Sequence, residues 1–172
     1  MKTPLTALLL AASLLLQATL LNHFTFFGVT ANLLSCIMIL LAFFYGNISA
    51  FILCLLAGLL FDLGFSPAIG PAALACSAAG ISTLLLKYFL DRDSLLSFMI
   101  AGVAGSLTFY ILEWILYSIM GVNIAFLHVL TRLPFFLIAN LLALLFFYFI
   151  IGRRAIRFAR DKTLRGSLPY YQ

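Results

Sequence analysis

Six apolar runs separated by short polar turns constrain this chain more than any other feature of its sequence. Hydrophobic residues make up 65% of its 172 residues and charged residues only 9%, too few to cover the surface of a soluble domain. About 20 apolar residues cross a bilayer as a helix. The sequence therefore predicts an all-α integral membrane protein, a compact bundle of six transmembrane helices. The expected spans are residues 5–21, 33–45, 48–61, 71–90, 95–120 and 133–151.

The basic residues are distributed unevenly and indicate the orientation. Six of the ten lie within residues 153–165, directly after the last apolar run, which is typical of a cytoplasmic juxtamembrane tail. With six spans, both termini and nine of the ten basic residues are cytoplasmic, and only Arg132 falls outside. We therefore expect a single transmembrane domain over residues 1–152 and a basic cytoplasmic tail over residues 153–172. The tail is expected to contact anionic lipid, and no nucleic acid partner is expected.

The first apolar run resembles a signal peptide. No clean cleavage site follows it, so we take it as an uncleaved span. Small residues dominate residues 71–90, which predicts a central helix, whereas the Leu and Phe of residues 133–151 predict a peripheral one. The cysteines lie inside apolar runs at unrelated spacings and are expected to be buried packing residues: Cys36, Cys54 and Cys76.

A polar segment follows the third run. Gly58-Leu59-Leu60-Phe61-Asp62 ends that run, and a turn containing Ser66-Pro67-Ala68-Ile69-Gly70 leads into the next. A carboxylate at the bilayer centre costs about 2.5–3.5 kcal/mol, so Asp62 is a candidate site that needs a partner. Gly58 allows close helix approach, and Pro67 and Gly70 fix the entry of the following helix. The alternative is that Asp62 meets headgroup water and helps to form the turn.

Two more ionisable residues are expected at a similar depth. In the six-span topology Asp62, Glu113 and Arg132 all lie toward the outer leaflet. Arginine offers a bidentate fork to a carboxylate, which predicts an ion-paired node with Glu113 and Arg132 as the favoured pair. The alternative is that each group meets water or headgroups separately. Glu113 also shares one face of its helix with Gly102, Ser106, Phe109 and Tyr117.

The sequence offers no pattern for catalysis. It has no nucleophile placed beside a base, no HExxH zinc motif and no Gly-rich phosphate loop, and its two histidines lie in separate expected loops. We therefore expect no enzymatic activity, no cofactor and no metal site.

The chain resembles the MreD family of bacterial rod shape-determining proteins. The resemblance covers the length, the six spans, the segment from Gly58 to Gly70, Leu112-Glu113-Trp114 and the basic tail. The family's middle segment is similar to Gly-Leu-Leu-x-Asp followed by a Ser/Gly-rich turn. The family often has a proline before the second span, where this chain has Thr30-Ala31-Asn32.

The resemblance implies a non-catalytic, multi-pass scaffold in the bacterial cytoplasmic (inner) membrane. Such a scaffold belongs to the elongation complex that maintains cell shape and supports lateral peptidoglycan synthesis. It is expected to bind the single-pass protein MreC and to help connect the MreB filament, indirectly, to RodA and a penicillin-binding transpeptidase. The alternative is the substrate-binding S component of an energy-coupling-factor vitamin transporter, a class of similar size with six spans and an outward-facing pocket.

Overall fold

The computed structural model describes residues 3–17, 19, 29–44, 48–66, 69–90, 94–122 and 125–152, and most of these residues are helical. The helices are α1 (Thr3–Leu16), α2 (Leu33–Phe44), α3 (Ile48–Phe65), α4 (Pro71–Leu86), α5 (Leu95–Ile119) and α6 (Phe126–Phe147), and a π-helical turn, η2 (Tyr148–Gly152), continues α6. The prediction of an all-α chain with six helices is confirmed. The expected tail at residues 153–172 and the candidate site residue Pro67 lie outside the described residues.

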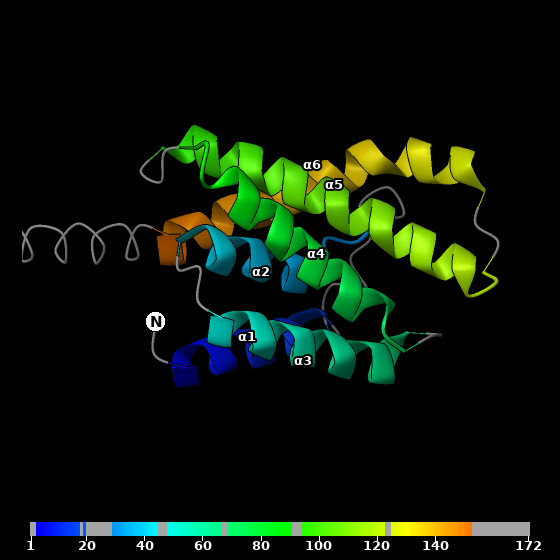
Figure 1. The fold of residues 1–172 in the computed structure, drawn as a ribbon, viewed down its shortest axis with the longest axis horizontal. Coiled ribbons are helices and arrows are strands. Elements are labelled where there is room, and N and C mark those ends of the chain that lie inside the picture. The colour runs from blue at the N-terminus through cyan, green and yellow to red at the C-terminus, as the bar shows by residue number, and fades with distance from the viewer. Residues whose placement is uncertain are drawn as a thin grey trace, which may run out of the picture.

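Successive helices are antiparallel (Figure 1). We call the end where α1 begins and η2 finishes the terminal end. We call the opposite end, where α3 and α5 finish and α4 and α6 begin, the carboxylate end, because Asp62 and Glu113 lie in the later turns of α3 and α5. In Figure 1, α1 and α3 lie on one side of the bundle and α5 and α6 on the other.

The central helix is α2. Ten of its twelve residues, Leu34 through Phe43, are buried, and it packs on all five other helices. A helix that is apolar all round is stable when other helices surround it. The expectation of a central helix over residues 71–90 is therefore only partly met, because α4 packs on α2, α3 and α5 but exposes Leu74, Ile81 and Leu85.

Close helix contacts depend on small residues. A Cβ atom on Gly58 would lie 2.7 Å from the Cα atom of Ala73, so the backbones of α3 and α4 touch at this point. A Cβ on Gly105 would lie 2.8 Å from a side-chain carbon of Ile39 and 2.9 Å from Oγ1 of Thr83. These glycines hold α4 against α3 and α5 against α2, as expected where small residues let helices approach closely.

The sixth helix begins earlier than predicted. We expected a loop over residues 121–131 and a helix from residue 133, but α6 starts at Phe126 and includes Arg132 and Pro134. Here the helix continues through Pro134, although proline removes one backbone hydrogen bond. Arg132 therefore lies inside α6 and does not open it. The expected outer position of this helix is confirmed, since most of its side chains are exposed or half-buried.

The outside of the bundle is apolar. Leucine, isoleucine and phenylalanine side chains are exposed along α3, α4, α5 and α6. Two helices, Leu95–Ile119 and Phe126–Ile150, are long and apolar enough to cross a membrane by length and composition. Shorter apolar helices are Leu33–Phe44, Cys54–Gly64 and Pro71–Leu86.

Candidate functional site at the carboxylate end

Asp62 caps the start of a neighbouring helix. Its side chain is 1% exposed, and its carboxylate accepts hydrogen bonds from the backbone N–H groups that begin α4. The donors are Gly70 at 3.0 Å, Ala72 at 3.0 Å and Ala73 at 3.2 Å, all to Oδ2, and Ala72 also approaches Oδ1 at 3.3 Å. The first N–H groups of a helix have no partner within the helix. Asp62 supplies that partner from the end of the preceding helix.

The local sequence explains this geometry. Gly70 precedes α4 with φ 113°, a left-handed conformation that favours glycine, and it has no side chain to serve as a cap. Pro71 follows at the first helical position, where its missing N–H removes no bond. Gly58 lies one turn before Asp62 and lets α3 approach α4 closely enough for the carboxylate to reach. Gly58, Asp62 and Gly70 therefore act together to dock α4 on α3.

Backbone N–H groups stabilise the negative charge of the buried Asp62 carboxylate. The start of a helix carries a partial positive charge, and hydrogen bonds to an ionised acceptor are stronger than neutral ones. Of the two interpretations of Asp62, the structure shows the one in which it forms the turn. It does so while buried in the bundle, which differs from the expected contact with headgroup water.

Of the other predicted residues, Ser66 and Glu113 lie near this cap, and Arg132 lies at the same end of the bundle. Tyr117 of α5 and Ser66, which follows α3, are joined by a hydrogen bond between their hydroxyl groups. Glu113 lies one turn before Tyr117 and is close enough to Asp62 for the two carboxylates to interact. Glu113 and Arg132 both act electrostatically on Tyr110, so α5 and α6 bring them to the same region. The expected ion pair between Glu113 and Arg132 stays a prediction.

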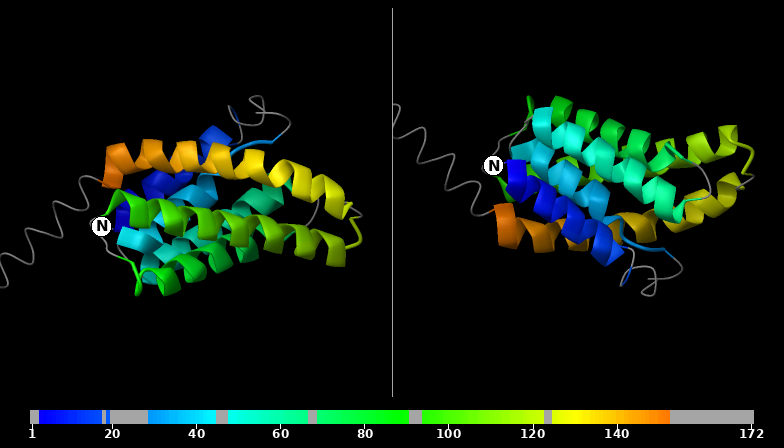
Figure 2. Two further views of the ribbon diagram at one scale, coloured as in Figure 1. Left: turned by 90° about the horizontal axis from the view of Figure 1, so that it is seen from above. Right: turned by 90° about the horizontal axis from the view of Figure 1, so that it is seen from below.

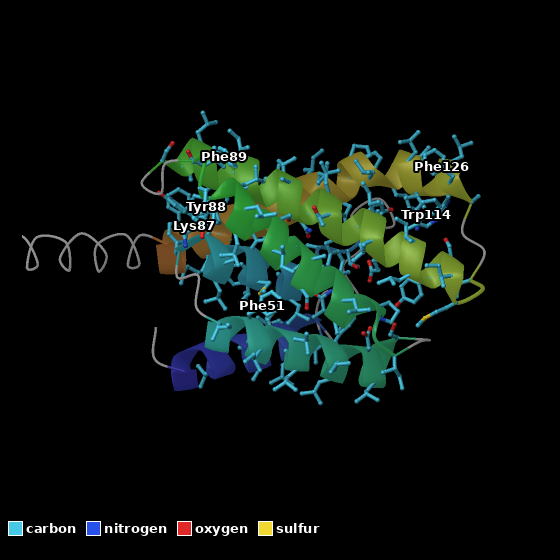
Figure 3. The ribbon with its side chains drawn as sticks, viewed as in Figure 1. Phe51, Lys87, Tyr88, Phe89, Trp114 and Phe126 are labelled. Atoms are coloured by element: carbon cyan, nitrogen blue, oxygen red, sulfur yellow. The ribbon has the colours of Figure 1, made fainter. Side chains whose placement is uncertain are left out.

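Aromatic rings complete this end of the bundle. Trp114 of α5 lies against Phe126 of α6, with ring centroids 5.6 Å apart (Figure 3). Tyr110 stacks on Phe136 at 4.7 Å. These contacts join α5 to α6 on either side of Glu113.

A second polar cluster, which was not predicted from the sequence, lies deeper in the bundle. Asn140 of α6 is 0% exposed; its Oδ1 accepts the backbone N–H of Asn32 at 2.9 Å, and its Nδ2 donates to Oγ of Ser106 at 3.3 Å. Asn32 caps α2 by accepting the N–H of Ser35 at 3.0 Å. Gln17, after α1, accepts the N–H of Leu33 at 2.8 Å.

This amide cluster fixes the start of the central helix. The backbone before α2 is not helical and is buried, so its N–H groups need partners from the other helices. Its signal in the sequence was a lone asparagine or glutamine within an apolar run.

Among the described residues, no group of three His, Cys, Asp or Glu residues could hold a metal ion, and no buried side-chain nitrogen or oxygen lacks a hydrogen-bond partner. The three cysteines are free and buried, as predicted. Cys54 of α3 and Cys76 of α4 lie with their thiols within hydrogen-bonding reach of each other.

Comparison with protein-family models, with curated proteins and with solved structures finds no match for this chain. Fold and site therefore define only a class: a small helical bundle with an apolar exterior, whose described buried polar side chains all have hydrogen-bond partners within the protein.

Proposed function

We propose that this protein is a multi-pass, non-catalytic scaffold of the bacterial cytoplasmic membrane. In this proposal it resembles MreD and binds MreC within the elongation complex. It thereby helps to connect the MreB filament to RodA and its penicillin-binding transpeptidase, and so supports rod shape and lateral peptidoglycan synthesis.

The distribution of polar and apolar side chains carries the membrane part of the proposal. Large apolar side chains are exposed along α3 to α6, whereas Asp62, Ser106 and Asn140 are buried and hydrogen-bonded. A soluble protein of this size rarely exposes extended apolar surface. A bilayer requires an apolar exterior and internally satisfied backbone groups, and both are found in the described helices.

The short central helix is compatible with this placement. At 1.5 Å per residue, the twelve residues of α2 measure about 18 Å, less than the 30 Å of a bilayer core. The other helices surround α2, so it does not need to cross lipid by itself. Non-helical backbone at membrane depth is tolerated where protein covers it, and the bonded backbone around Asn32 meets that condition.

The two ends of the bundle support the proposed orientation. Lys87, Tyr88 and Phe89 lie together at the terminal end, and Trp114 and Phe126 lie near the carboxylate end (Figure 3). Aromatic residues are enriched at both membrane interfaces, and cytoplasmic segments are rich in Lys and Arg. The basic tail follows η2, which finishes at the terminal end, and the proposal therefore makes that end cytoplasmic.

The exposed apolar faces of the helices support the scaffold role. Asp62 and Asn140 accept hydrogen bonds from backbone N–H groups at the starts of neighbouring helices, which holds those helices in fixed positions. The apolar faces on the outside are then available to neighbouring transmembrane helices, which associate through packing in a membrane.

Co-purification tests the proposal directly. The tagged full-length protein is purified from its host membrane in mild detergent, beside an unrelated six-span protein carrying the same tag, and bound proteins are identified by mass spectrometry. We expect specific recovery of MreC, RodA and the transpeptidase, and rounding of rod cells on depletion. Retention of rod shape after depletion, without recovery of MreC, would refute the scaffold role.

A vitamin-transporter S component is the second candidate. Glu113, Tyr117 and Arg132 are only partly buried and lie at the end that such a protein opens to its ligand. In that case the same purification would recover an energising module with ATPases, and the purified protein would bind a vitamin.

A further inference from the structure

Two of the three cysteines are neighbours in the folded protein. Cys54 of α3 and Cys76 of α4 face each other where these helices pack together, and their thiols lie within hydrogen-bonding reach. Figures 1 and 2 show α3 and α4 as adjacent helices of the bundle. Cys36 of α2 belongs to a different apolar cluster, together with Ile39 and Phe43. It therefore serves as an isolated thiol against which the pair can be compared.

The backbones of α3 and α4 are close enough for a disulfide. A disulfide needs Cα atoms about 4.4–6.8 Å apart. A Cβ on Gly58 would lie 2.7 Å from the Cα of Ala73, and a carbon–carbon bond is about 1.5 Å long, so the two Cα atoms are at most about 4.2 Å apart. Cys54 lies one turn before Gly58, and Cys76 lies about one turn after Ala73. In antiparallel helices these two positions come next to each other, which agrees with the contact between the thiols.

Apolar side chains surround the two thiols. Cys54 is 1% exposed and Cys76 is 0% exposed. Both belong to one core cluster with Ala57, Ala79 and Phe109. A single thiol in such surroundings is unreactive, because the thiolate is the reactive form and burial disfavours it. A second thiol alongside changes the outcome of any reaction, since it can displace the group that the first thiol has gained.

We propose that Cys54 and Cys76 form a redox site inside the bundle, which closes to a disulfide when a lipid-soluble two-electron oxidant reaches it. Each thiol gives up one proton and one electron, the two sulfur atoms become bonded, and the oxidant takes up both protons and both electrons. A quinone is thereby reduced to a hydroquinone, and an apolar disulfide to two thiols. The route through lipid rests on the proposed membrane placement, whereas the closure itself does not.

Closure fixes α4 on α3. The new bond joins the two helices one turn from the contact at Gly58 and encloses residues 54–76, which include Asp62 and the start of α4. A disulfide stabilises a fold mainly because it restricts the unfolded chain. The oxidised pair therefore adds a covalent link to the helix contact that Asp62 and Gly58 already form.

Two disulfide reagents of different solubility test the proposal. The full-length protein in dioleoyl phosphatidylcholine vesicles is treated with dithiodipyridine, which dissolves in lipid, or with the anionic dithiobis(nitrobenzoate), which stays in water. A thiol that attacks either reagent becomes a mixed disulfide and releases one aromatic thiol. A neighbouring thiol then displaces the second aromatic thiol, whereas an isolated thiol keeps its adduct. Mass spectrometry separates the products, because closure removes two hydrogen atoms and an adduct adds mass.

We expect dithiodipyridine to link Cys54 to Cys76, as identified by peptide mapping, and any product at Cys36 to remain an adduct. In the matched variants Cys54→Ala and Cys76→Ala, the remaining member of the pair should also keep its adduct. Closure should raise the Tm of the wild-type protein by about 4–16 °C. The anionic reagent should leave both thiols free.

Free thiols or lasting adducts at both Cys54 and Cys76 after dithiodipyridine would overturn the proposal. Peptide mapping of the wild type needs no variant, so this result stands even if Cys54→Ala or Cys76→Ala fails to fold. Closure by the anionic reagent as readily as by the apolar one would overturn the lipid route. A Tm that closure leaves unchanged or lowers would overturn the stabilising link between α3 and α4. None of these measurements involves MreC, so their failure is distinguishable from failure of the scaffold role.

Discussion

Replacing Asp62 tests the physical basis of the candidate site. The carboxylate bonds three backbone N–H groups at the start of α4, and Asp62→Ala leaves all three without their acceptor. Loss of a helix cap costs about 0.5–2 kcal/mol, and each buried N–H left unbonded costs about 1–3 kcal/mol. Since the helix start can partly relax, we expect a total loss of about 3–5 kcal/mol.

Asp62→Asn separates charge from hydrogen bonding. The amide keeps one acceptor oxygen but loses the negative charge that complements the start of α4, and its NH₂ group gains no acceptor there. We therefore expect a smaller loss, about 1–3 kcal/mol. Leu63→Ala on the next, exposed position is the matched control, and it should cost less than either Asp62 variant.

Thermal unfolding in detergent, followed by circular dichroism, measures these differences. For a chain of this size, 1 kcal/mol shifts the Tm by about 2–4 °C, so Asp62→Ala should lower it by roughly 6–20 °C. A Tm for Asp62→Ala equal to that of Leu63→Ala would refute the capping argument. An unchanged Tm for Asp62→Asn, with loss of MreC capture, would instead indicate that the carboxylate serves a partner.

Three further predictions follow from the packing and the polar clusters. Gly58→Ala should destabilise the fold by about 1–3 kcal/mol because the new methyl group meets the backbone of α4, whereas Gly64→Ala, with nothing within 4 Å, should be neutral or slightly stabilising in the same melting experiment. Asn140→Ala should cost about 2–4 kcal/mol, since it leaves a buried backbone N–H before α2 unbonded and opens a cavity; a Tm within 1 °C of wild type would contradict this. If Glu113 and Arg132 form the expected pair, Glu113→Arg and Arg132→Glu should each lower the Tm, and their combination should restore it; failure of the double variant to recover would dismiss the pair.

The apolar periodicity predicted the helices well. Each expected run overlaps one α-helix of the structure, and Gly58 was correctly assigned to a close helix contact. These features follow from local chemistry: apolar run length and the spacing of small side chains are properties of the chain itself. The predicted start of α6 was wrong because residues 126–131, which are only partly apolar and include His128, continue the helix and do not form a loop.

The sequence alone predicted that Asp62, Glu113 and Arg132 lie at one end of the bundle. In an up-and-down topology, the position of a residue along its helix determines its depth in the membrane. It did not determine what Asp62 bonds to, or that Asn140 meets the start of the central helix. Those partners are backbone N–H groups, and every residue except proline carries one, so no side-chain pattern marks which will lie near a given carboxylate or amide. Only the packing of α3 on α4, and of α6 beside α2, decides which of these identical donors comes within reach.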